Sequence, residues 1–301
     1  MNSIIEHQND QHILDKLSAQ RNIYSEAKCW RNIRFIVCVL SVIVLSVMKA
    51  IWSDNKTITI VLLVTVFISL LLGPVFNLQI AKKKVLAARI QQLIDIYLFD
   101  LVWDDHLCGQ QPTAEVILDH RDNPIPSDLY NWYDKGIGDI QDFKTAVLLC
   151  QRENLFYDSH IRTTYTNMCK RLAAILCMGI FITGVIIYHA DIIPIIVFGL
   201  IPITPIIRWI QSVVNEDEKD KSAREMLESL VYKEMENAIN GKPIHSTELK
   251  RIQGYMFIHR RDGYLVPDWY YKFSRSKSEA RVAYSVQEYL ERFKPIQKGL
   301  D

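Results

Sequence analysis

The feature that most constrains this chain is the uneven distribution of its charged residues. Lys, Arg, Asp and Glu nearly vanish from two regions, roughly 35–80 and 172–207, and they crowd into the rest of the sequence. Apolar stretches of about 18 residues or more with few charges are typical of helices that cross a lipid bilayer. The sequence therefore indicates an integral membrane protein, and the lipid bilayer is its first expected partner.

Four stretches are candidates for transmembrane helices, and the sequence groups them into two hairpins. They are Phe35–Met48, Thr57–Ile80, Leu172–Ala190 and Ile192–Ile207. The first is short, but it extends to Trp52 if Lys49 snorkels to the far interface. The second carries no charge along its whole length, which is ample for the ~20 residues that a span needs. The sequence SDNK between these two stretches predicts a turn.

The second apolar region is too long to be a single span. As one helix, residues 172–207 would extend roughly 54 Å at 1.5 Å per residue, whereas the hydrocarbon layer is ~30 Å thick. We therefore expect a hairpin that turns at 189–191. The fourth span contains Pro194, Pro202 and Pro205, and proline kinks a helix because it removes a backbone donor. Such a helix could line a cavity or pore, or its kink could be static and satisfied by neighbouring helices.

The Lys and Arg residues that flank the spans gather on one side of the membrane. That side has Lys28, Arg31, Arg34, Lys82, Lys83, Lys84, Arg162, Lys170, Arg171 and Arg208. The opposite flanks have only Lys49 and Lys56. Because cytoplasmic flanks carry the excess of Lys and Arg, we expect both termini and the region between the hairpins to be cytoplasmic.

The expected domain organisation follows from these spans. It comprises a cytoplasmic N-terminal helix (1–34), a transmembrane hairpin (35–80), a cytoplasmic middle region (81–171), a second transmembrane hairpin (172–208) and a cytoplasmic C-terminal helical region (209–301). Apolar residues at helical spacing predict further helices at 11–32, 82–101, 217–240, 247–258 and 277–293. No stretch alternates like a strand. The predicted fold class is an all-α integral membrane protein with four transmembrane helices and a helical cytoplasmic domain.

Two local signals refine this organisation. Asn240-Gly241, with Pro243 beyond, predicts that the helix 217–240 ends there. The region 104–142 is rich in Asp, Pro, Gly and Asn, which indicates loops with short helices. We also expect the helix 82–101 to continue the second span into the cytoplasm.

Composition excludes some partners. The chain has 35 Lys and Arg against 34 Asp and Glu, so a diffuse basic surface for duplex DNA is not indicated. Its six cysteines form no CxxC pair and no metal-ligand spacing, which favours free thiols in a reducing cytoplasm. We expect no DNA partner, no metal site and no cofactor.

The sequence offers no convincing set of catalytic residues. HRD at 120–122 and HRRD at 259–262 have the form of a kinase catalytic triplet, but no Gly-rich loop, strand lysine or downstream asparagine accompanies either. The acid pairs Asp104/Asp105 and Asp139/Asp142 lack a matching His or Glu, and they are typical of solvated loops. Phosphate-loop, dinucleotide-binding and nucleophile-elbow motifs are absent from the sequence. We therefore expect no enzyme activity.

Arginines and aromatic residues cluster in two cytoplasmic segments, and each cluster has two interpretations. In CQRENLFYDSHIRTTY (150–165), Asp158 and Arg162 are spaced for a helical ion pair. Alternatively, Arg152 and Arg162 lie on roughly one helix face and could grip phosphates. In the segment 257–275, the rings of Trp269, Tyr270 and Tyr271 could stack on nucleobases, or they could pack as core. The basic side chains beside these rings are Arg260, Arg261, Lys272 and Arg275. The residues alone leave these alternatives open.

Several segments, taken together and in order, resemble one protein family. They are LSAQRNIYSEAKCWR (17–31), IQQLIDIYLFDLVWDD (90–105), NWYDKG (131–136), AVLLCQRENLFYDSHIRTTY (146–165) and RIQGYMFIHRRDGYLVPDWYYKFSR (251–275). With the interleaved hairpins, they resemble the SMODS-associated four-transmembrane effector family of bacterial CBASS anti-phage systems, over nearly the whole chain. Where that family often has Trp followed by Asp after CQRxN, this chain has Phe156, Tyr157 and Asp158.

The resemblance implies a function. In such systems a nucleotidyltransferase of the same operon makes a cyclic oligonucleotide on infection. The effector binds it through its cytoplasmic part and breaches the inner membrane, so that the infected cell dies before phage matures. For this chain the resemblance implies a cyclic di- or trinucleotide ligand and a homo-oligomer. The ligand-binding residues expected on this basis are Arg152, Arg162, Trp269, Tyr271, Arg275 and Arg261, although part of this set could form ion pairs between the middle and tail segments.

Two other hypotheses compete with this one. The runner-up is a constitutive small-solute channel or transporter with a structural cytoplasmic helical domain, and the third is a scaffold that recruits a partner through its helical tail. The spans lack buried charge, which disfavours ion-coupled transport. Their polar residues are Ser41, Ser46, Thr65, Ser69, Asn77, Thr183 and Thr204. So few polar groups predict a crude leak rather than a selective channel.

Overall fold

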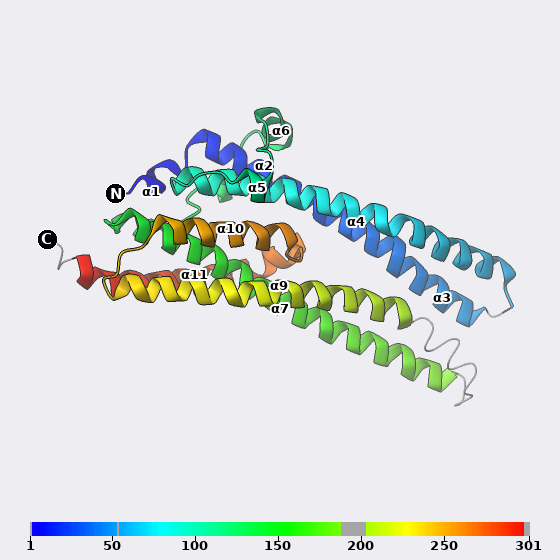
Figure 1. Ribbon diagram of the computed structural model, residues 1–301. Coiled ribbons are helices and arrows are strands. Elements are labelled where there is room, and N and C mark those ends of the chain that lie inside the picture. Colours follow the sequence, from blue (N-terminus) through cyan, green and yellow to red (C-terminus); the bar gives the residue numbers. More distant parts are fainter. Residues whose placement is uncertain (1, 53, 188–202, 298–301) are drawn as a thin grey trace. The chain divides into compact units, whose positions relative to one another are not determined.

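A computed structural model describes residues 2–52, 54–187 and 203–297, and the regular elements within these ranges are all helical (Figure 1). The prediction of an all-α fold is therefore confirmed. The elements are α1 (Ser3–His7), α2 (Gln11–Phe35), a π-helix η1 (Ile36–Leu40), α3 (Ser41–Ile51), α4 (Lys56–Leu98), α5 (Asp105–Cys108), α6 (Ala114–His120), η2 (Ser127–Leu129), η3 (Lys135–Asp139), α7 (Phe143–Ile187), α9 (Thr204–Ile239), α10 (Ser246–Asp262) and α11 (Asp268–Gln297).

The chain divides into two compact units. The globular unit comprises Met1–Glu26, Lys83–Arg162 and Lys219–Asp301, and the apolar unit comprises Ala27–Lys82 and Thr163–Glu218. Helices α2, α4, α7 and α9 each contribute residues to both units. The apolar unit is larger than the two expected hairpins because it includes helical turns that flank the apolar stretches.

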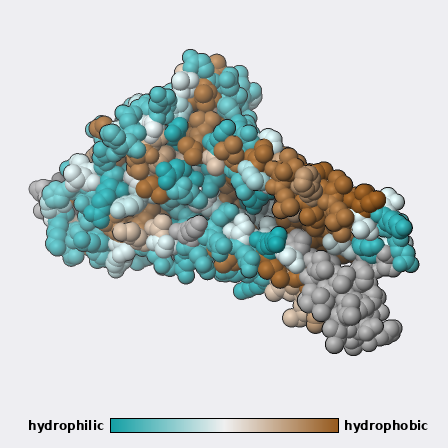
Figure 2. Space-filling view, turned by 45° about the vertical axis from the view of Figure 1, so that its right-hand side comes forward, coloured by the Kyte–Doolittle hydropathy of each residue, from teal (hydrophilic) through white to brown (hydrophobic). Residues whose placement is uncertain are grey.

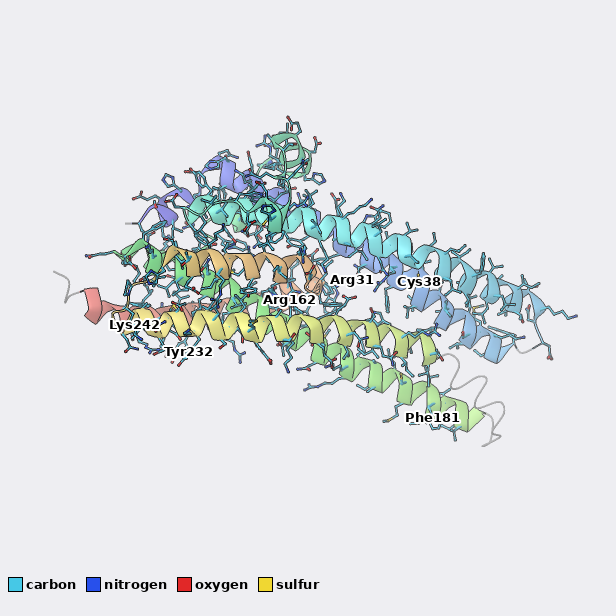
Figure 3. All side chains as sticks on the ribbon, viewed as in Figure 1. Arg31, Cys38, Arg162, Phe181, Tyr232 and Lys242 are labelled. Carbon is cyan, nitrogen blue, oxygen red and sulfur yellow. The ribbon has the colours of Figure 1, made fainter. Side chains whose placement is uncertain are left out.

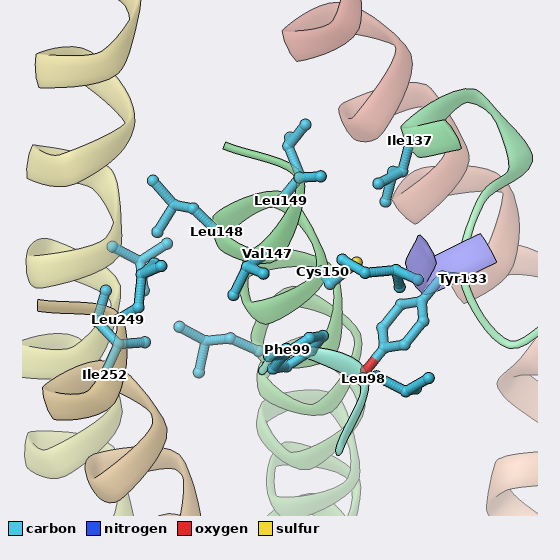
Figure 4. Close-up of a cluster of buried hydrophobic side chains, with 14 of the residues drawn as sticks. Leu98, Phe99, Tyr133, Ile137, Val147, Leu148, Leu149, Cys150, Leu249 and Ile252 are labelled. Carbon is cyan, nitrogen blue, oxygen red and sulfur yellow. The ribbon is translucent and has the colours of Figure 1, made fainter. Parts of the chain in front are cut away.

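The core of the globular unit is built around the first turns of α7. The five consecutive residues Ala146–Cys150 are 0% exposed, so this part of the helix is enclosed on all sides. Figure 4 shows the side chains that surround it: Leu98 and Phe99 at the end of α4, Tyr133 and Ile137 from the loop region before α7, and Leu249 and Ile252 of α10. This packing holds α7 and α10, which carry most of the polar groups described below.

Helix ends in the globular unit follow the expected local chemistry. Helix α9 ends at Ile239, next to the predicted end at Asn240-Gly241. Gly241 adopts a φ of +72°, a conformation that favours glycine. Asp142 accepts hydrogen bonds from the backbone N–H of Thr145 (3.0 Å) and from its hydroxyl (2.6 Å). Asp104 accepts one from the N–H of Leu107 (3.2 Å). Asp104 therefore caps α5, within the region of short helices predicted at 104–142, and Asp142 caps the start of α7.

The apolar unit exposes side chains that water solvates poorly. Leu63 is 63% exposed and Leu70 is 65% exposed. Figure 2 shows hydrophobic surface gathered over this unit. Among the described residues, Gln11–Lys49, Lys56–Leu98 and Phe143–Thr183 are long and apolar enough to cross a membrane. They contain the expected first and second spans and most of the third.

The fourth expected span, Ile192–Ile207, falls largely outside the described residues. The expected turn at 189–191 and two of its prolines, Pro194 and Pro202, lie outside them as well. From Thr204 onward the chain is helical, and α9 continues without interruption into the predicted helix 217–240. The second span likewise continues as one helix, α4, through the predicted helix 82–101 to Leu98.

Small polar groups join η1 to α4 inside the apolar unit. The hydroxyl of Ser69 donates to the carbonyl oxygen of Val37 (3.2 Å), and the thiol of Cys38 lies 3.7 Å from the carbonyl oxygen of Ser69. The hydroxyl of Ser41 donates to the same Val37 carbonyl (2.6 Å). A π-turn breaks the regular ladder of backbone hydrogen bonds, and hydroxyls that bond backbone carbonyls are typical of helix contacts in membranes. Cys38 is labelled in Figure 3.

Candidate functional site

A buried histidine joins two carboxylates inside the globular unit. His259 of α10 places Nε2 2.6 Å from Asp158 Oδ2 and Nδ1 2.6 Å from Asp220 Oδ1. An imidazole carries protons on both nitrogens only when it is charged. Burial alone would lower the pKa of His259, but its contacts with Asp158 and Asp220 outweigh that effect, and the pKa is raised. The two carboxylates therefore favour the charged form of His259.

Two arginines complete this group, which we call the His259 network (Asp158, Arg162, Asp220, Arg224 and His259). Arg162 donates from Nε to Asp158 (2.6 Å) and from Nη1 to the carbonyl oxygen of Tyr264. Arg224 places Nε 3.2 Å from Asp220 and donates from Nη1 to the carbonyl oxygen of Ser159 (3.1 Å). In Figure 3, Arg162 lies amid the helices of the globular unit. The network thus ties α7, α9 and α10 together.

Charge within the network fixes its ionisation. Burial would raise the pKa of Asp158, but the Arg162 guanidinium and the hydrogen bond from His259 hold that pKa well below its usual range. Burial would lower the pKa of Arg162, yet Asp158 and Asp220 raise it. Two guanidiniums and the His259 imidazole therefore face two carboxylates, and of these five side chains only that of Asp158 is more than one tenth exposed.

The turn after α10 leaves no room for a side chain beside this network. A Cβ on Gly263 would lie 2.6 Å from Arg162 Nη1 and 2.5 Å from the carbonyl oxygen of His259. Both distances are shorter than atoms tolerate, so only glycine allows the chain to pass so close to the guanidinium.

A second buried group, the Asp95 network, connects α4, α7 and α10. Arg260 donates from Nη1 to Asp95, and Gln253 donates to Asp95 (2.8 Å) and to Gln92 (2.9 Å). Gln151 of α7 donates to the side-chain oxygen of Gln253 (3.1 Å). Buried polar groups are retained when their hydrogen bonds are satisfied, and such networks specify one packing arrangement.

An open groove lies on the surface of the globular unit, where α7 and α11 meet. It encloses about 490 Å³, and its walls are Phe156, Ala280, Arg281, Tyr284, Ser285 and Glu288. Residues 281, 284, 285 and 288 follow the spacing of one helix face. Phe156 is 37% exposed and Tyr284 is 74% exposed. The groove thus presents two accessible rings between an arginine and a glutamate.

The contacts between α7 and α11 beside the groove show that these two helices run antiparallel. Arg281 Nη1 lies 3.0 Å from His160 Nε2, while Arg152 donates to the hydroxyl of Ser285 (2.6 Å). The Arg152 guanidinium also lies over the ring of Tyr289, at 4.1 Å from its centroid, and 5.6 Å from that of Phe156. Arg152 therefore supports the groove through contacts with two of its walls, Phe156 and Ser285.

The structure separates the six residues expected to bind a ligand. Arg162 belongs to the His259 network, and the Tyr271 hydroxyl approaches the same carboxylate, 3.5 Å from Asp158 Oδ1. Arg152 supports the groove. Trp269 is 58% exposed on the first turn of α11 and meets Tyr270 edge to face at 5.7 Å.

The remaining two of the six are placed as follows. Arg261 forms an ion pair with Asp262 (2.7 Å), and its guanidinium lies 5.9 Å from the centroid of the Phe257 ring. Arg275 belongs to α11, but its side chain is outside the part of the chain that the structure describes. The structure thus brings Arg162 and Tyr271 together, and it places Arg152, Trp269 and Arg261 in other surroundings.

Several residues of these sites were missed by the sequence analysis. His259 stands in HRRD, where it was considered only as part of a kinase motif, and Asp220 lies in a long charged run that looks fully solvated. Arg281 and Tyr284 share a helix face with ordinary polar residues. The one usable signal was the i, i+4 spacing of Asp158 and Arg162, and that expected ion pair is confirmed.

The raised pKa of His259 makes the stability of the protein depend on pH. A group whose pKa is higher in the folded chain adds stability that is fully present below its unfolded pKa, about 6.5, and is lost as the pH rises through the folded value. We expect the unfolding temperature of the detergent-solubilised protein to fall as the pH rises above about 6.5, and this fall to be smaller in His259→Gln.

The comparison with His259→Gln isolates this residue from other titrating groups. Burial raises the pKa of Glu153 to about 7, so that its own contribution is lost mainly below the pH range of His259. Asp158, whose pKa is lowered, loses its contribution only in acid. Thermal scans of both proteins at matched pH values provide the measurement, and parallel curves would show that folding does not raise the pKa of His259.

The fold defines a class of protein: an all-helical integral membrane protein that also has a globular helical unit. The model of the SMODS-associating 4TM effector domain family matches residues 2–289, and the chain belongs to this family. It is 24% identical over 289 residues to a probable CBASS effector molecule of Bacillus cereus (strain VD146), an alignment that covers 93% of this chain and 95% of the relative. No solved structure matches the chain.

Membership of the family places this protein among the membrane effectors of CBASS antiviral defence. The segments that carry the resemblance also supply the buried networks, apart from Asp220 and Arg224. Gln92 and Asp95 lie in IQQLIDIYLFDLVWDD, Gln151 lies in CQREN, and His259 and Arg260 lie in HRR. These polar residues hold helices of the globular unit together, which is a structural reason for their use.

Proposed function

We propose that this protein is a membrane effector that a cyclic oligonucleotide activates, and that it disrupts the bacterial inner membrane to cause abortive infection. The observation that carries the proposal is that one helix, α7, has residues in both units. This helix extends from Phe143 to Ile187. It contributes Arg152 and Phe156 to the globular unit and apolar residues such as Phe181 to the apolar unit. One helix thus belongs to both a candidate receptor and a membrane-embedded part.

The globular unit is the proposed receptor for the nucleotide, on the cytoplasmic side of the inner membrane. Support for this side comes from the basic flanks of the apolar stretches, which include Lys28, Arg31 and Lys82. Arg152, Trp269, Arg261 and Arg275 are proposed to contact the ligand or to line its site, whereas Arg162 and Tyr271 act as positioning residues through Asp158. Phosphates would be recognised by arginine and bases by aromatic rings.

Activation requires a difference in affinity between two states of the protein. A ligand shifts a conformational equilibrium only as far as it binds one state more tightly than the other. Moving the protein from almost entirely inactive to almost entirely active needs about 5.5 kcal/mol. A cyclic di- or trinucleotide carries several phosphates and bases, and a homo-oligomer multiplies the number of sites. Contacts with a few arginines and rings per protomer could therefore supply this energy.

The polar groups of the apolar unit favour a crude leak over a selective pore. The hydroxyls of Ser46, Thr65 and Thr183 each donate to a carbonyl four residues earlier in the same helix, at 2.7 to 2.8 Å. Groups that are satisfied within their own helix have little left for coordinating an ion. We therefore propose that the active state breaches the bilayer without discriminating between small solutes.

Liposomes that contain the protein and a self-quenching dye provide the test. We expect release of dye only when the protein and its cognate cyclic nucleotide are both present, because the inactive state keeps the bilayer intact. A panel of cyclic di- and trinucleotides identifies the ligand, and the matching linear dinucleotides serve as controls. Release without any nucleotide would instead indicate a constitutive channel, and no release with the whole panel would contradict the proposal.

A further inference from the structure

We propose that the groove between α7 and α11 binds one nucleotide of the activating ligand, with its base against Phe156 and Tyr284, its phosphate at Arg281 and the donor edge of its base at Glu288. This inference rests on the proposed function, because that function supplies a cyclic nucleotide as the ligand. It names a site other than the expected one, since only Arg152 of the six expected residues touches this groove.

The size and the lining of the groove fit one nucleotide, with an aromatic base and a charged phosphate. Its volume of about 490 Å³ lies within the ~300–1,000 Å³ range of small-molecule sites. Phe156 and Tyr284 are both accessible, so that solvated aromatic surface is available to a partner. Bases stack on such rings irrespective of their sequence. Because the groove is open, the rest of a cyclic ligand can project into solvent.

The two charged walls stand at opposite ends of the groove. Arg281 and Glu288 are seven residues apart on α11, which is about 10 Å along the helix axis. The negative charge of Glu288 interacts with the positive charge of Arg152, whose guanidinium also contacts Ser285 and the Tyr289 ring. Arg281 contacts the imidazole of His160, which carries no negative charge. Arg281 is therefore the guanidinium of this groove that is best suited to a phosphate.

The acidic wall matches one edge of a base. A carboxylate only accepts hydrogen bonds, so it suits a base that presents amino or imino donors. Guanine presents two adjacent donors on one edge, whereas uracil presents one. The arrangement therefore predicts that cyclic di-GMP binds more tightly than cyclic di-UMP, and that Glu288→Gln narrows this difference.

Calorimetric titration of the full-length protein in lipid nanodiscs tests the site. The probes are cyclic di-GMP, cyclic di-AMP, cyclic GMP–AMP, cyclic di-UMP and cyclic tri-AMP. We expect Tyr284→Ala to weaken the binding of the tightest probe by about 5- to 150-fold, the range for loss of one stacked base. Tyr284→Phe keeps the ring and should bind within about twofold of the wild type. Arg281→Ala should weaken binding by about tenfold or more, because a charge-assisted contact is lost.

Matched controls separate a local site from general damage. Tyr232 of α9 is 59% exposed and lies outside the groove lining, so Tyr232→Ala controls for Tyr284→Ala. Arg251 forms an ion pair with Glu248 (3.2 Å) and controls for Arg281→Ala. If the wild type binds a probe and both Tyr284→Ala and Arg281→Ala bind it with the same affinity, this site is wrong, while the proposed function stands. A wild type that binds none of the probes would overturn the proposed function, and with it this site.

Discussion

Asp220→Ala is expected to lower the free energy of unfolding of the globular unit by about 3–5 kcal/mol. The carboxylate of Asp220 lies 2.6 Å from His259 Nδ1 and 3.2 Å from Arg224 Nε, and all three side chains are almost fully buried. Removing it takes the carboxylate away from the buried Arg224 guanidinium and from His259, and an uncompensated buried charge costs far more than the intact pair contributes. Urea unfolding in detergent, with hydrogen exchange at amides of α7 and α10, would measure the loss.

An exposed ion pair provides the control for this experiment. Arg21 and Asp128 are 2.9 Å apart, but about two fifths of each side chain is accessible to solvent. Removing a partner from such a pair changes stability by ~0–1 kcal/mol, because water and salt screen the charges. Asp128→Ala should therefore unfold nearly as the wild type does. If Asp220→Ala were no more destabilised than Asp128→Ala, the His259 network would not be the buried, dry assembly that its distances describe.

Phe99→Ala is expected to destabilise the globular unit by a similar amount, about 3–5 kcal/mol, for a different reason. Phe99 is 1% exposed, and its ring centroid lies 6.0 Å from that of Tyr133. Truncation removes buried apolar surface and leaves a cavity beside the enclosed turns of α7, which cannot collapse fully into the space. Urea unfolding provides the measurement, and the slope of the free energy of unfolding against urea concentration should stay near the wild-type value.

Phe273 provides the matched control for this second substitution. Its side chain is 81% exposed on α11, so Phe273→Ala removes a ring of the same size without opening a cavity. Surface substitutions of this kind usually change stability by less than about 0.5 kcal/mol. Equal losses in the two variants would mean that Phe99 is not packed in the core shown in Figure 4.

Local signals in the sequence were enough to predict several helices, although the first half of α7 and the first turns of α11 were not among the predicted helices. The uncharged run at 57–80 identifies a span because few sequences other than membrane helices lack charge for so long. Gly241 marks the end of α9 because a positive φ is costly for other residues. Asp158 and Arg162 are one helical turn apart, so their pairing could be anticipated from spacing alone. In each case the information lies within a few residues of the feature.

The candidate site could not be predicted in the same way, because its contacts join distant parts of the chain. Asp158 meets His259 across a separation of 101 residues, and Arg152 meets Ser285 across 133. The residues near Asp220 are so rich in charge that a buried carboxylate looks like a solvated one. The aromatic cluster at 266–275 divides in the fold, because Tyr270 is buried whereas Trp269 is exposed. Which ring faces solvent depends on the neighbours of α11, which the sequence does not show.

The order of the chain has a consequence for its synthesis on the ribosome. Asp158 and Arg162 are translated about a hundred residues before His259, and the apolar stretches of α3, α4 and α7 all precede α10. A nascent chain therefore delivers these apolar helices to the insertion machinery before His259, which joins Asp158 to Asp220, has been synthesised. Insertion of the apolar helices can therefore begin before α10 completes the globular unit, and a chain truncated after α9 would lack the histidine that joins Asp158 to Asp220.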